Sequence, residues 1–402
     1  MAKRILFVSG SLGLGHIGRD LAIARELRRQ NGSLEIDWLA ASPADRVLRD
    51  AGENLLPEAR ELGDENAVAE SHANGGGLSL LRYLLGARDN WRQNVSVVQR
   101  VASGGDYDLL VGDETYELIV AYKQGKARKP LPFVMIYDFI GMDAMGWNPM
   151  ERLGAYLWNR SWSRGGNDVS AISSIVDLSL FIGEEEDVQD RPFGPFLPNR
   201  REWARRRCEF VGYVLSFDPR DYQDRRALRR QLGYDPDLPL VICSIGGTAI
   251  GRGLLELCGR AYRVAADRIP DLQMVLVSGP RLDPDTLDVP DGVARRGYVP
   301  HLYEHLAAGD LSVVQGGGTL TLELTALGQP FLYFPIPGHC EQQVHVAGRL
   351  RRHRAGVGMD SLNTSPEELA EAMVRNLGGE VDTGHVPVEG ARVAAEKISR
   401  LL

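Results

Sequence analysis

Short apolar runs alternate with longer helical patterns along the whole chain. The first run, Ile5–Val8, is followed by a helical pattern over about 18–30. The apolar face of that helix holds Leu21, Ala24 and Leu27. Further apolar runs in this half lie at 34–40, 109–112, 133–137 and 178–182. These runs do not alternate apolar with polar residues, which is typical of parallel strands buried on both faces.

The same rhythm begins again in the second half. Its apolar runs lie at 240–244, 274–278, 311–314 and 331–334, with helical patterns between them. Strands that alternate with helices predict a doubly wound α/β sheet, and two such series predict two domains. We place an N-terminal domain at 1–212, a C-terminal domain at 213–385, and a last helix at 386–402 that packs back toward the N-terminal domain.

Composition and charge exclude several classes of function. The chain has 402 residues and a formal net charge of −8, so it is not expected to bind nucleic acid, which requires a basic surface. Its 4 cysteines form no CxxC pair, which argues against a zinc site or a disulfide framework and favours a cytoplasmic location. No stretch reaches the roughly 18 consecutive apolar residues of a membrane-spanning helix. Peripheral contact with the inner face of a membrane stays open.

Glycine-rich loops follow three of the predicted strands. They are Gly10–Gly18, Gly246–Thr248 and Gln315–Thr319. Loops of this kind at the carboxyl ends of parallel strands let backbone N–H groups approach a phosphate, and the N-terminus of the next helix favours the phosphate charge. Because two of these loops belong to the C-terminal domain, we expect that domain to bind a diphosphate.

The first loop also contains the string GxGxxG, formed by Gly13, Gly15 and Gly18, which is found in dinucleotide-binding oxidoreductases. Three features argue against that function. The 4 residues between Val8 and Gly13 make the turn wide, and the second predicted strand does not end in an acid that would bind a ribose. His16 would also crowd a pyrophosphate at the start of the helix.

Several motifs together resemble the UDP-glycosyltransferase superfamily, whose members are inverting enzymes with the GT-B fold. In the C-terminal half these motifs are GYVPH at 297–301, QGGGTLTLELTALGQP at 315–330 and FPIPGHCEQQVHVAGRL at 334–350. The pair Gly15-His16 is also similar to a motif of the family that adds N-acetylglucosamine to the lipid-linked peptidoglycan precursor. The resemblance implies two Rossmann-like, doubly wound parallel-sheet domains that face each other across a cleft.

The resemblance also implies how a nucleotide sugar binds, with UDP preferred in the family. Tyr298 stacks on the base, Val299 offers its backbone to the base edge, and Glu323 holds both ribose hydroxyls. The other residues assigned to the nucleotide sugar are Gly15, Gly246, Gly247, Thr248, His301, Gln315, Gly316, Gly317, Gly318, Thr319, Gln342 and Gln343. Two positions depart from the family: Gln315 replaces a histidine that contacts the β-phosphate in many relatives, and Val346 replaces a frequent asparagine.

His16 matches the catalytic base of the family, and its chemistry supports that role independently. A hydroxyl group must lose its proton as it attacks an anomeric carbon, and histidine exchanges protons near neutral pH. Asp113 ends another strand of the same domain, so it is the candidate partner for the second ring nitrogen, and it matches the acid of many relatives. Asp138, after the next strand, is its rival. A purely structural role at the helix start is the alternative for His16.

Three other motifs carry less weight. The string HLYEH at 301–305 resembles a metalloprotease motif but overlaps the base-binding motif. Two DxD strings, at 235–237 and 283–285, contain prolines and lie in loops, so we expect turns there and no metal site. The basic run at 200–207 predicts a solvated helix face, with contact to an anionic acceptor or lipid as the alternative.

The sequence therefore predicts a glycosyltransferase that moves a sugar, with inversion, from a nucleotide sugar to a hydroxyl group of an apolar acceptor. Apolar segments with aromatic residues at 78–85 and 139–164 suggest that this acceptor is a lipid or a natural product. We expect no metal and no cofactor besides the donor substrate. The alternatives are a nucleotide-sugar epimerase on the same fold and a non-catalytic protein that binds a nucleotide sugar.

Overall fold

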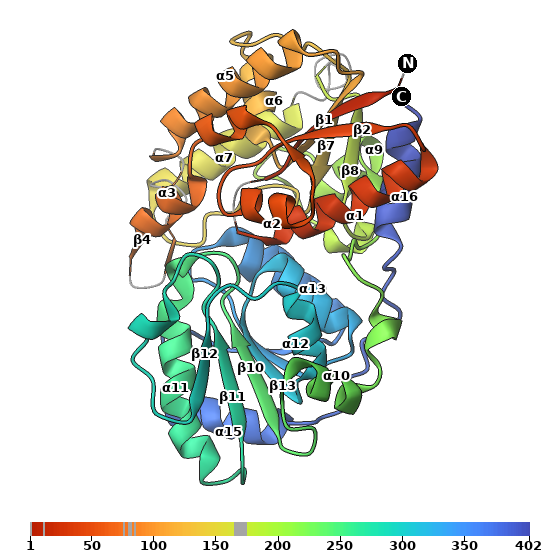
Figure 1. The fold of residues 1–402 in the computed structure, drawn as a ribbon. Coiled ribbons are helices and arrows are strands. Elements are labelled where there is room, and N and C mark those ends of the chain that lie inside the picture. The colour runs from red at the N-terminus through yellow and green to blue at the C-terminus, as the bar shows by residue number, and fades with distance from the viewer. Residues whose placement is uncertain (1, 11–12, 75–76, 79–82, 84–85, 165–174) are drawn as a thin grey trace. The chain divides into compact units, whose positions relative to one another are not determined.

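The computed structural model describes residues 2–10, 13–74, 77–78, 83, 86–164 and 175–402 (Figure 1). The chain forms two compact units. Unit 1 consists of Met1–His72, Ser79–Ser216 and Pro387–Leu402, and unit 2 consists of Ala73–Leu78 and Phe217–Val386. Each unit is built around its own parallel sheet.

The sheet of unit 1 contains seven strands among the described residues, in the order β3-β2-β1-β6-β7-β8-β9, and all are parallel. They are β1 (Arg4–Val8), β2 (Glu35–Leu39), β3 (Asn54–Leu55), β6 (Leu109–Asp113), β7 (Phe133–Tyr137), β8 (Leu178–Phe181) and β9 (Glu209–Phe210). The strand order reverses between β1 and β6. Ligands of open α/β sheets bind at such a switch point, at the carboxyl ends of the strands.

The sheet of unit 2 contains six strands among the described residues, in the order β12-β11-β10-β13-β14-β15, again all parallel. They are β10 (Leu240–Ser244), β11 (Gln273–Val277), β12 (Val293–Arg296), β13 (Leu311–Gln315), β14 (Phe331–Phe334) and β15 (Val357–Gly358). Here the order reverses between β10 and β13, the two strands that precede the predicted phosphate loops. The prediction of two doubly wound parallel sheets is confirmed.

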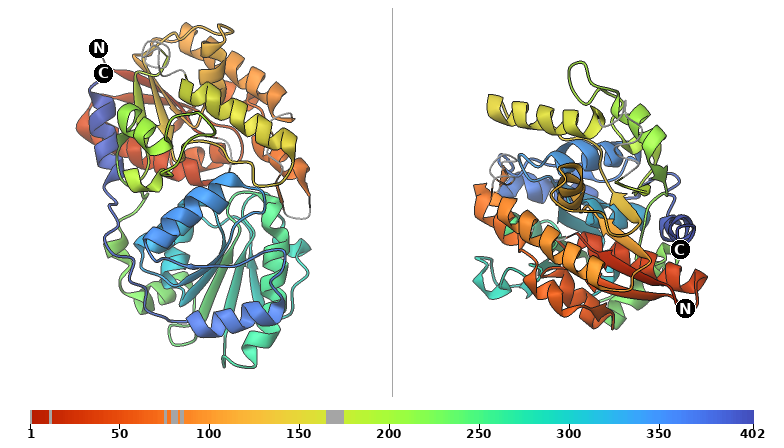
Figure 2. Two further views of the ribbon diagram at one scale, coloured as in Figure 1. Left: turned by 180° about the vertical axis from the view of Figure 1, so that it is seen from behind. Right: turned by 90° about the horizontal axis from the view of Figure 1, so that it is seen from above.

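Helices cover both faces of each sheet (Figure 2). Alternate residues of β1 point to opposite faces, so Ile5 packs with α1 (Gly15–Gln30) and Leu6 packs with α5 (Arg88–Gly104). The other α-helices of the described residues are α2 (Ala44–Asp50), α3 (Glu65–His72), α6 (Tyr116–Lys123), α7 (Pro149–Arg164), α9 (Arg200–Arg207), α10 (Arg225–Leu232), α11 (Arg252–Ala266), α12 (Leu302–Ala308), α13 (Gly318–Ala326), α14 (Ala347–Arg352), α15 (Pro366–Asn376) and α16 (Gly390–Ser399). Within the described ranges, none of the helices has the length and apolar composition needed to cross a membrane.

The last helix, α16, belongs to unit 1 although it follows unit 2 in the chain. Its residues Ala394 and Ile398 are fully buried in one core with Leu27 of α1. The side-chain amide of Asn31 donates a hydrogen bond to Oγ of Ser399 across 2.8 Å. These contacts attach the end of the chain to the helix that carries His16.

Candidate active site

The loop after β1 lies at the switch point of unit 1 and leads into α1. The N–H group of Gly13, which has a φ of 76°, donates to Oδ1 of Asn66 across 2.8 Å. A Cβ atom on Gly10 would lie 3.2 Å from the ring of His16 and 3.1 Å from the carbonyl oxygen of Asp113. Glycine at position 10 therefore lets the backbone pass beside the ring, which a side chain there would displace.

His16 lies in the first turn of α1 and contacts Asp113, the last residue of β6. Its Nδ1 atom lies 2.9 Å from Oδ2 of Asp113, whose side chain is fully buried. The His16 side chain is 14% exposed, so the ring is not fully buried. Because β1 and β6 are neighbours in the sheet, the segments that follow them bring these two predicted residues together.

Opposing effects act on the pKa of His16. Burial and the charge of Arg19 lower the pKa, whereas the carboxylates of Asp113 and Asp138 raise it. The carboxylates prevail, and the pKa of His16 lies above its ordinary value. His16 is therefore a stronger base than a histidine in water.

Arg19, which the sequence analysis did not single out, joins the acids around His16. Its Nε and Nη2 atoms donate to the two carboxylate oxygens of Asp113 across 3.0 and 2.6 Å, and Nη1 donates to Asp138 across 2.8 Å. Its side chain is only 5% exposed. Arg19 follows His16 by three positions, so both side chains share one face of α1, and this spacing was available in the sequence.

The rival acid, Asp138, is bound by Arg19, and Asp113 takes the place beside Nδ1 of His16. Glu114 lies near the other ring nitrogen, with Oε2 3.8 Å from Nε2 of His16. Burial and the neighbouring Asp138 raise the pKa of Glu114 well above its ordinary value. Ligand atoms of His16, Glu114 and Asp138 lie within 4.8 Å of one another, but the Arg19 charge opposes a cation there.

The two glycine-rich loops of unit 2 also lie at a switch point. Gly246 adopts a φ of 77°, and Thr248 precedes the short helix η4 (Ala249–Gly251). Gly317 precedes α13, and no side chain within the described residues caps the start of that helix. The first N–H groups of α13 are therefore available to an anion. The remaining predicted residues of these loops and of the first turn of α13 are Gly247, Gln315, Gly316, Gly318 and Thr319.

Gln342 and Gln343 hold the loop that follows β14. Oε1 of Gln342 accepts the N–H of Ile336 across 2.8 Å, and Oε1 of Gln343 accepts the N–H of Gly338 across 3.0 Å. These contacts orient both amide groups and assign their oxygen atoms as the acceptors. Each NH2 group then remains a donor, which suits recognition of sugar hydroxyls.

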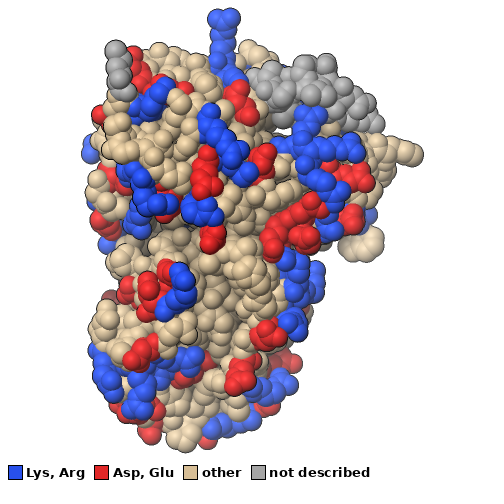
Figure 3. Space-filling model, turned by 90° about the vertical axis from the view of Figure 1, so that its right-hand side faces the viewer, with Lys and Arg blue, Asp and Glu red and all other residues tan. Residues whose placement is uncertain are grey.

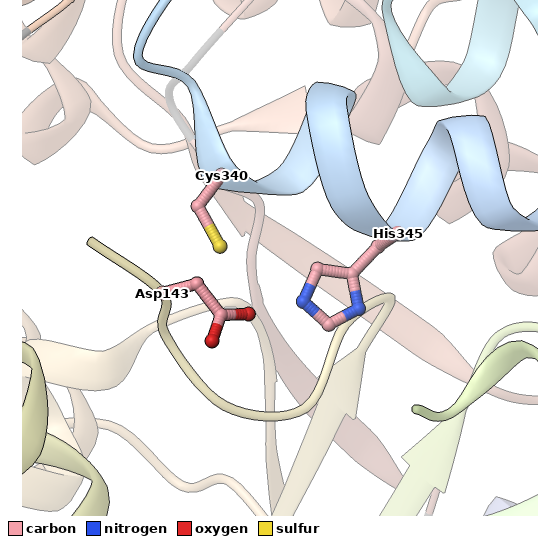
Figure 4. A group of neighbouring side chains, drawn as sticks. All are labelled: Asp143, Cys340 and His345. Carbon is pink, nitrogen blue, oxygen red and sulfur yellow. The ribbon is translucent and has the colours of Figure 1, made fainter. Parts of the chain in front are cut away.

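Both glutamines belong to a π-helical turn, η6 (Glu341–Val346). Cys340 immediately precedes this turn and His345 lies within it (Figure 4). Asp143, also labelled in Figure 4, belongs to unit 1. Val346, one of the two departures from the family pattern, ends the turn. Turns of this kind occur frequently at functional sites.

Glu323 lies on α13, and burial raises its pKa to about 8. An aromatic pair that the sequence analysis did not identify lies nearby. The rings of Phe217 and Tyr303 stack with their centroids 4.2 Å apart, and the pKa of Tyr303 is raised by burial, by Tyr222 and, to a smaller extent, by Glu323. Tyr303 lies within the HLYEH string, two residues after the base-binding motif, so its position along the chain was a clue.

The base-binding residues lie between β12 and α12. Tyr298 and Val299 are half-buried in this loop. His301 adopts a left-handed φ of 52° before α12, and its ring stacks on that of Tyr303 at 5.6 Å. The loop therefore presents the side chains of Tyr298 and His301 beside α12.

The HLYEH and DxD strings form local structure. His305 is buried, and its Nδ1 atom lies 2.6 Å from the hydroxyl group of Tyr234. In both DxD strings the first aspartate accepts the N–H of the third residue, at 2.9 Å for Asp235 and 3.0 Å for Asp283. These contacts explain the strings as packing and turn residues.

The basic run on α9 is largely ion-paired. Arg200 is buried and binds Asp143 across 2.8 Å, and Arg205 pairs with Glu185. On the face of the molecule in Figure 3, basic and acidic side chains are interspersed. This arrangement favours a solvated, charge-balanced helix over a binding site for an anion.

The two apolar segments differ in what the structure describes. Most of 78–85 lies outside the described residues. In 139–164, Trp162 packs within a group of aromatic rings that includes Tyr137 and Phe139. By contrast, Trp147 is 87% exposed. The other exposed apolar residues of this segment are Met145, Met150, Leu153 and Leu157.

Comparison with known proteins identifies relatives. No family model matches the chain. An uncharacterised glycosyltransferase of Methanopyrus kandleri is 28% identical over 173 residues, which are 43% of this chain and 48% of that protein, so the match spans about half of the relative. The UDP-N-acetylglucosamine–N-acetylmuramyl-(pentapeptide) pyrophosphoryl-undecaprenol N-acetylglucosamine transferase of Clavibacter michiganensis is 34% identical over 357 residues, 86% of this chain and 80% of that enzyme.

Solved structures share the fold over the full length. The glycotransferase of kitacinnamycin superposes with a TM-score of 0.62 at 17% identity, covering 100% of both chains. The glycosyltransferase SnogD of Streptomyces nogalater gives a TM-score of 0.58 at 18% identity, also over 100% of both chains. The chain belongs to the glycosyltransferases of GT-B fold, in the family that includes the Clavibacter michiganensis enzyme.

Proposed function

We propose that this glycosyltransferase moves a sugar from a nucleoside-diphosphate sugar, UDP-linked by family preference, to a hydroxyl group of an apolar acceptor, with inversion. The observation that carries the proposal is the 2.9 Å contact between Nδ1 of His16 and the buried carboxylate of Asp113. A histidine that donates from Nδ1 to a carboxylate keeps its Nε2 lone pair for a proton. The His16 side chain is 14% exposed, which agrees with access of an acceptor to the ring.

In the proposed reaction, Nε2 of His16 removes the proton of the acceptor hydroxyl as its oxygen attacks the anomeric carbon. The bond from that carbon to the diphosphate breaks on the opposite side, so the configuration inverts. Asp113 stabilises the imidazolium ion that forms. Backbone N–H groups at the start of α13 stabilise the charge on the leaving diphosphate, and we assign no metal or cofactor to this step.

The proposed donor site combines the loops of unit 2 with Glu323. The two glycine-rich loops lie at a switch point, where open α/β sheets bind ligands, and α13 begins with uncapped N–H groups. An ionised Glu323 would accept hydrogen bonds from both ribose hydroxyls. Gln342 and Gln343 would donate to the sugar.

The acceptor is proposed to be apolar, either a lipid or a natural product. Both kinds occur in the names of similar proteins: an undecaprenol-linked substrate in the Clavibacter enzyme and kitacinnamycin in a solved structure. The exposed apolar residues around the start of α7 support this class of acceptor.

A thermal-shift panel tests the donor half of the proposal. Uridine, thymidine and guanosine diphosphates and their sugars are each added to the protein. A ligand at a hundred times its Kd stabilises the folded state by about 2.7 kcal/mol, which is a visible shift. A panel in which no nucleotide raises the Tm would refute the proposed donor class. The sugar nucleotide that stabilises the protein is then assayed without an acceptor. An epimerase would convert this sugar nucleotide, whereas a transferase that needs an acceptor hydroxyl would not.

A further inference from the structure

Nδ1 of His16 has two competing partners. Oδ2 of Asp113 lies 2.9 Å from this atom, and Nη2 of Arg19 lies 2.7 Å from it. A ring nitrogen donates a hydrogen bond only when it carries a proton and accepts one only when it does not. The two contacts therefore belong to different tautomers of the neutral ring. Only the tautomer with the proton on Nδ1 leaves Nε2 free to take a proton from a hydroxyl.

The hydrogen bonds of Arg19 favour this tautomer. Nη2 already donates to Oδ1 of Asp113 across 2.6 Å, so this group has an acceptor without the histidine. Nε donates to the second oxygen of Asp113, and Nη1 donates to Asp138. The guanidinium group thus holds Asp113 by both oxygens, and Asp113 in turn accepts the proton of Nδ1.

The charge of Arg19 also acts on the ring. Among the described residues, the other titratable groups that face His16 are acids: Asp113 and Glu114 at the end of β6, and Asp138 after β7. Asp20 on α1 interacts with Asp113. Without the guanidinium group, the carboxylates of Asp113 and Asp138 would stabilise the imidazolium ion strongly, because charges interact strongly where little water is present. A ring that is already protonated cannot accept the proton of an acceptor.

We propose that Arg19 is a positioning residue of the active site, which holds Asp113 against Nδ1 of His16 and limits protonation of the ring between turnovers. This role rests on the proposed function of His16 as the base. Arg19 itself is 5% exposed, so its effect on the reaction passes through Asp113 and His16.

The test is an NMR titration of protein labelled with ¹⁵N-histidine, with His16 assigned by the signal that His16→Asn removes. In the wild type we expect the neutral ring to carry its proton on Nδ1. In Arg19→Gln the titration midpoint of His16 should move to higher pH, and the acid limb of the kcat profile should move with it. Arg25→Gln is the matched control, since Arg25 is exposed on the same helix, and it should leave the midpoint unchanged.

A second pair of variants covers the case in which Arg19→Gln does not fold. Asp138→Asn should lower the midpoint, and adding Arg19→Gln to it, which restores the balance of charge, should raise the midpoint again. A midpoint that stays or falls when Arg19 is replaced, in either background, would overturn the proposal, as would a wild-type ring protonated on Nε2. The NMR titrations use the free protein and test the role of Arg19. The proposed base function of His16 is tested separately, and it fails if His16→Ala transfers sugar at the wild-type rate.

Discussion

Oε2 of Glu114 lies 3.8 Å from Nε2 of His16, the ring nitrogen that does not contact Asp113. The backbone of Glu114 has a φ of 51°, a left-handed conformation that costs a residue with a side chain about 1–2 kcal/mol. The hydroxyl group of Tyr116 donates to Oε1 of Glu114 across 3.2 Å. The fold thus holds this acid, against local strain, beside the nitrogen that would receive the acceptor proton.

Glu114 should make stability depend on pH. The pKa of this carboxyl group is raised in the folded protein, first by burial and then by Asp138. The folded state therefore binds the proton more tightly than the unfolded state, and the resulting stability is lost as the pH rises through the folded pKa. We expect Glu114→Gln, which does not titrate, to flatten the decline in the free energy of unfolding above pH 5 or so. Urea unfolding at several pH values measures this dependence, with Glu367→Gln at an exposed position as the control. Parallel curves of unfolding free energy against pH for Glu114→Gln and the wild type would contradict the prediction.

His16 and Asp113 should contribute unequally to the transfer step. His16→Ala removes the base and should slow transfer by about 10²–10⁴, the usual effect of a positioned base. Asp113→Asn should slow it less, because the ring remains and loses only its orientation and charge support. Both variants should bind UDP with nearly wild-type affinity by calorimetry, because neither residue belongs to unit 2. Transfer at the wild-type rate by His16→Ala would exclude base catalysis by this residue.

Glu323 should couple UDP binding to pH. Its pKa of about 8, raised by burial, means that a neutral acid predominates below that pH, while the ribose hydroxyls need an ionised acceptor. We therefore expect UDP to bind more tightly as the pH rises through about 8. Glu323→Ala should weaken donor binding by about 2–4 kcal/mol and remove this pH dependence. Calorimetry that finds the same UDP affinity in wild type and variant would refute the ribose contact.

The sequence predicts the sheets well because their strands are buried on both faces. The runs at 5–8 and 109–112, for example, are apolar without alternation, and they form the neighbours β1 and β6. Strand order in a doubly wound sheet then places the following loops at one edge. For this reason the contact between His16 and Asp113 was predictable from two short segments that lie far apart in the chain.

The surroundings of His16 were less predictable, because they depend on where long side chains point. Arg19 is buried by tertiary contacts, whereas Arg25 on the same helix is exposed, and the residue type alone does not distinguish them. The left-handed backbone of Glu114 is likewise unmarked, since glycine or asparagine usually occupies such positions. Both features follow from contacts between the ends of β6 and β7 and the first turns of α1.

Metal removal tests the interpretation of the acidic strings. Because Asp235 and Asp283 accept backbone N–H groups within their own turns, we expect EDTA to leave the transfer rate unchanged. The Arg19 charge beside Asp138 argues for the same outcome at the His16 cluster. Rates measured with EDTA, and again after adding manganese, provide the check. A complete loss that manganese reverses would show that the reaction uses a metal.

The exposed apolar face of α7 should bind the acceptor. Met150, Leu153 and Leu157 are 60%, 50% and 51% exposed, and their spacing of three and four residues places them on one face of the helix. Trp147 lies just before the helix, with the guanidinium group of Arg152 4.8 Å from its ring centre. Single exposed apolar residues are common on protein surfaces. A continuous row of them beside a tryptophan is instead typical of a surface that contacts another molecule.

We expect the double variant Leu153→Glu/Leu157→Glu to lose transfer to apolar acceptors while keeping UDP affinity, because a charged face repels an apolar molecule but leaves unit 2 intact. Leu362→Glu is the matched control, since Leu362 is 64% exposed in unit 2. Liposome flotation distinguishes the two acceptor classes. Flotation that anionic lipid strengthens, and that the double variant abolishes, would assign a lipid acceptor. Absence of flotation, together with turnover of soluble aromatic or polyketide-like alcohols, would assign a natural product. If only small hydrophilic sugars accepted the transferred sugar, an apolar acceptor would be excluded.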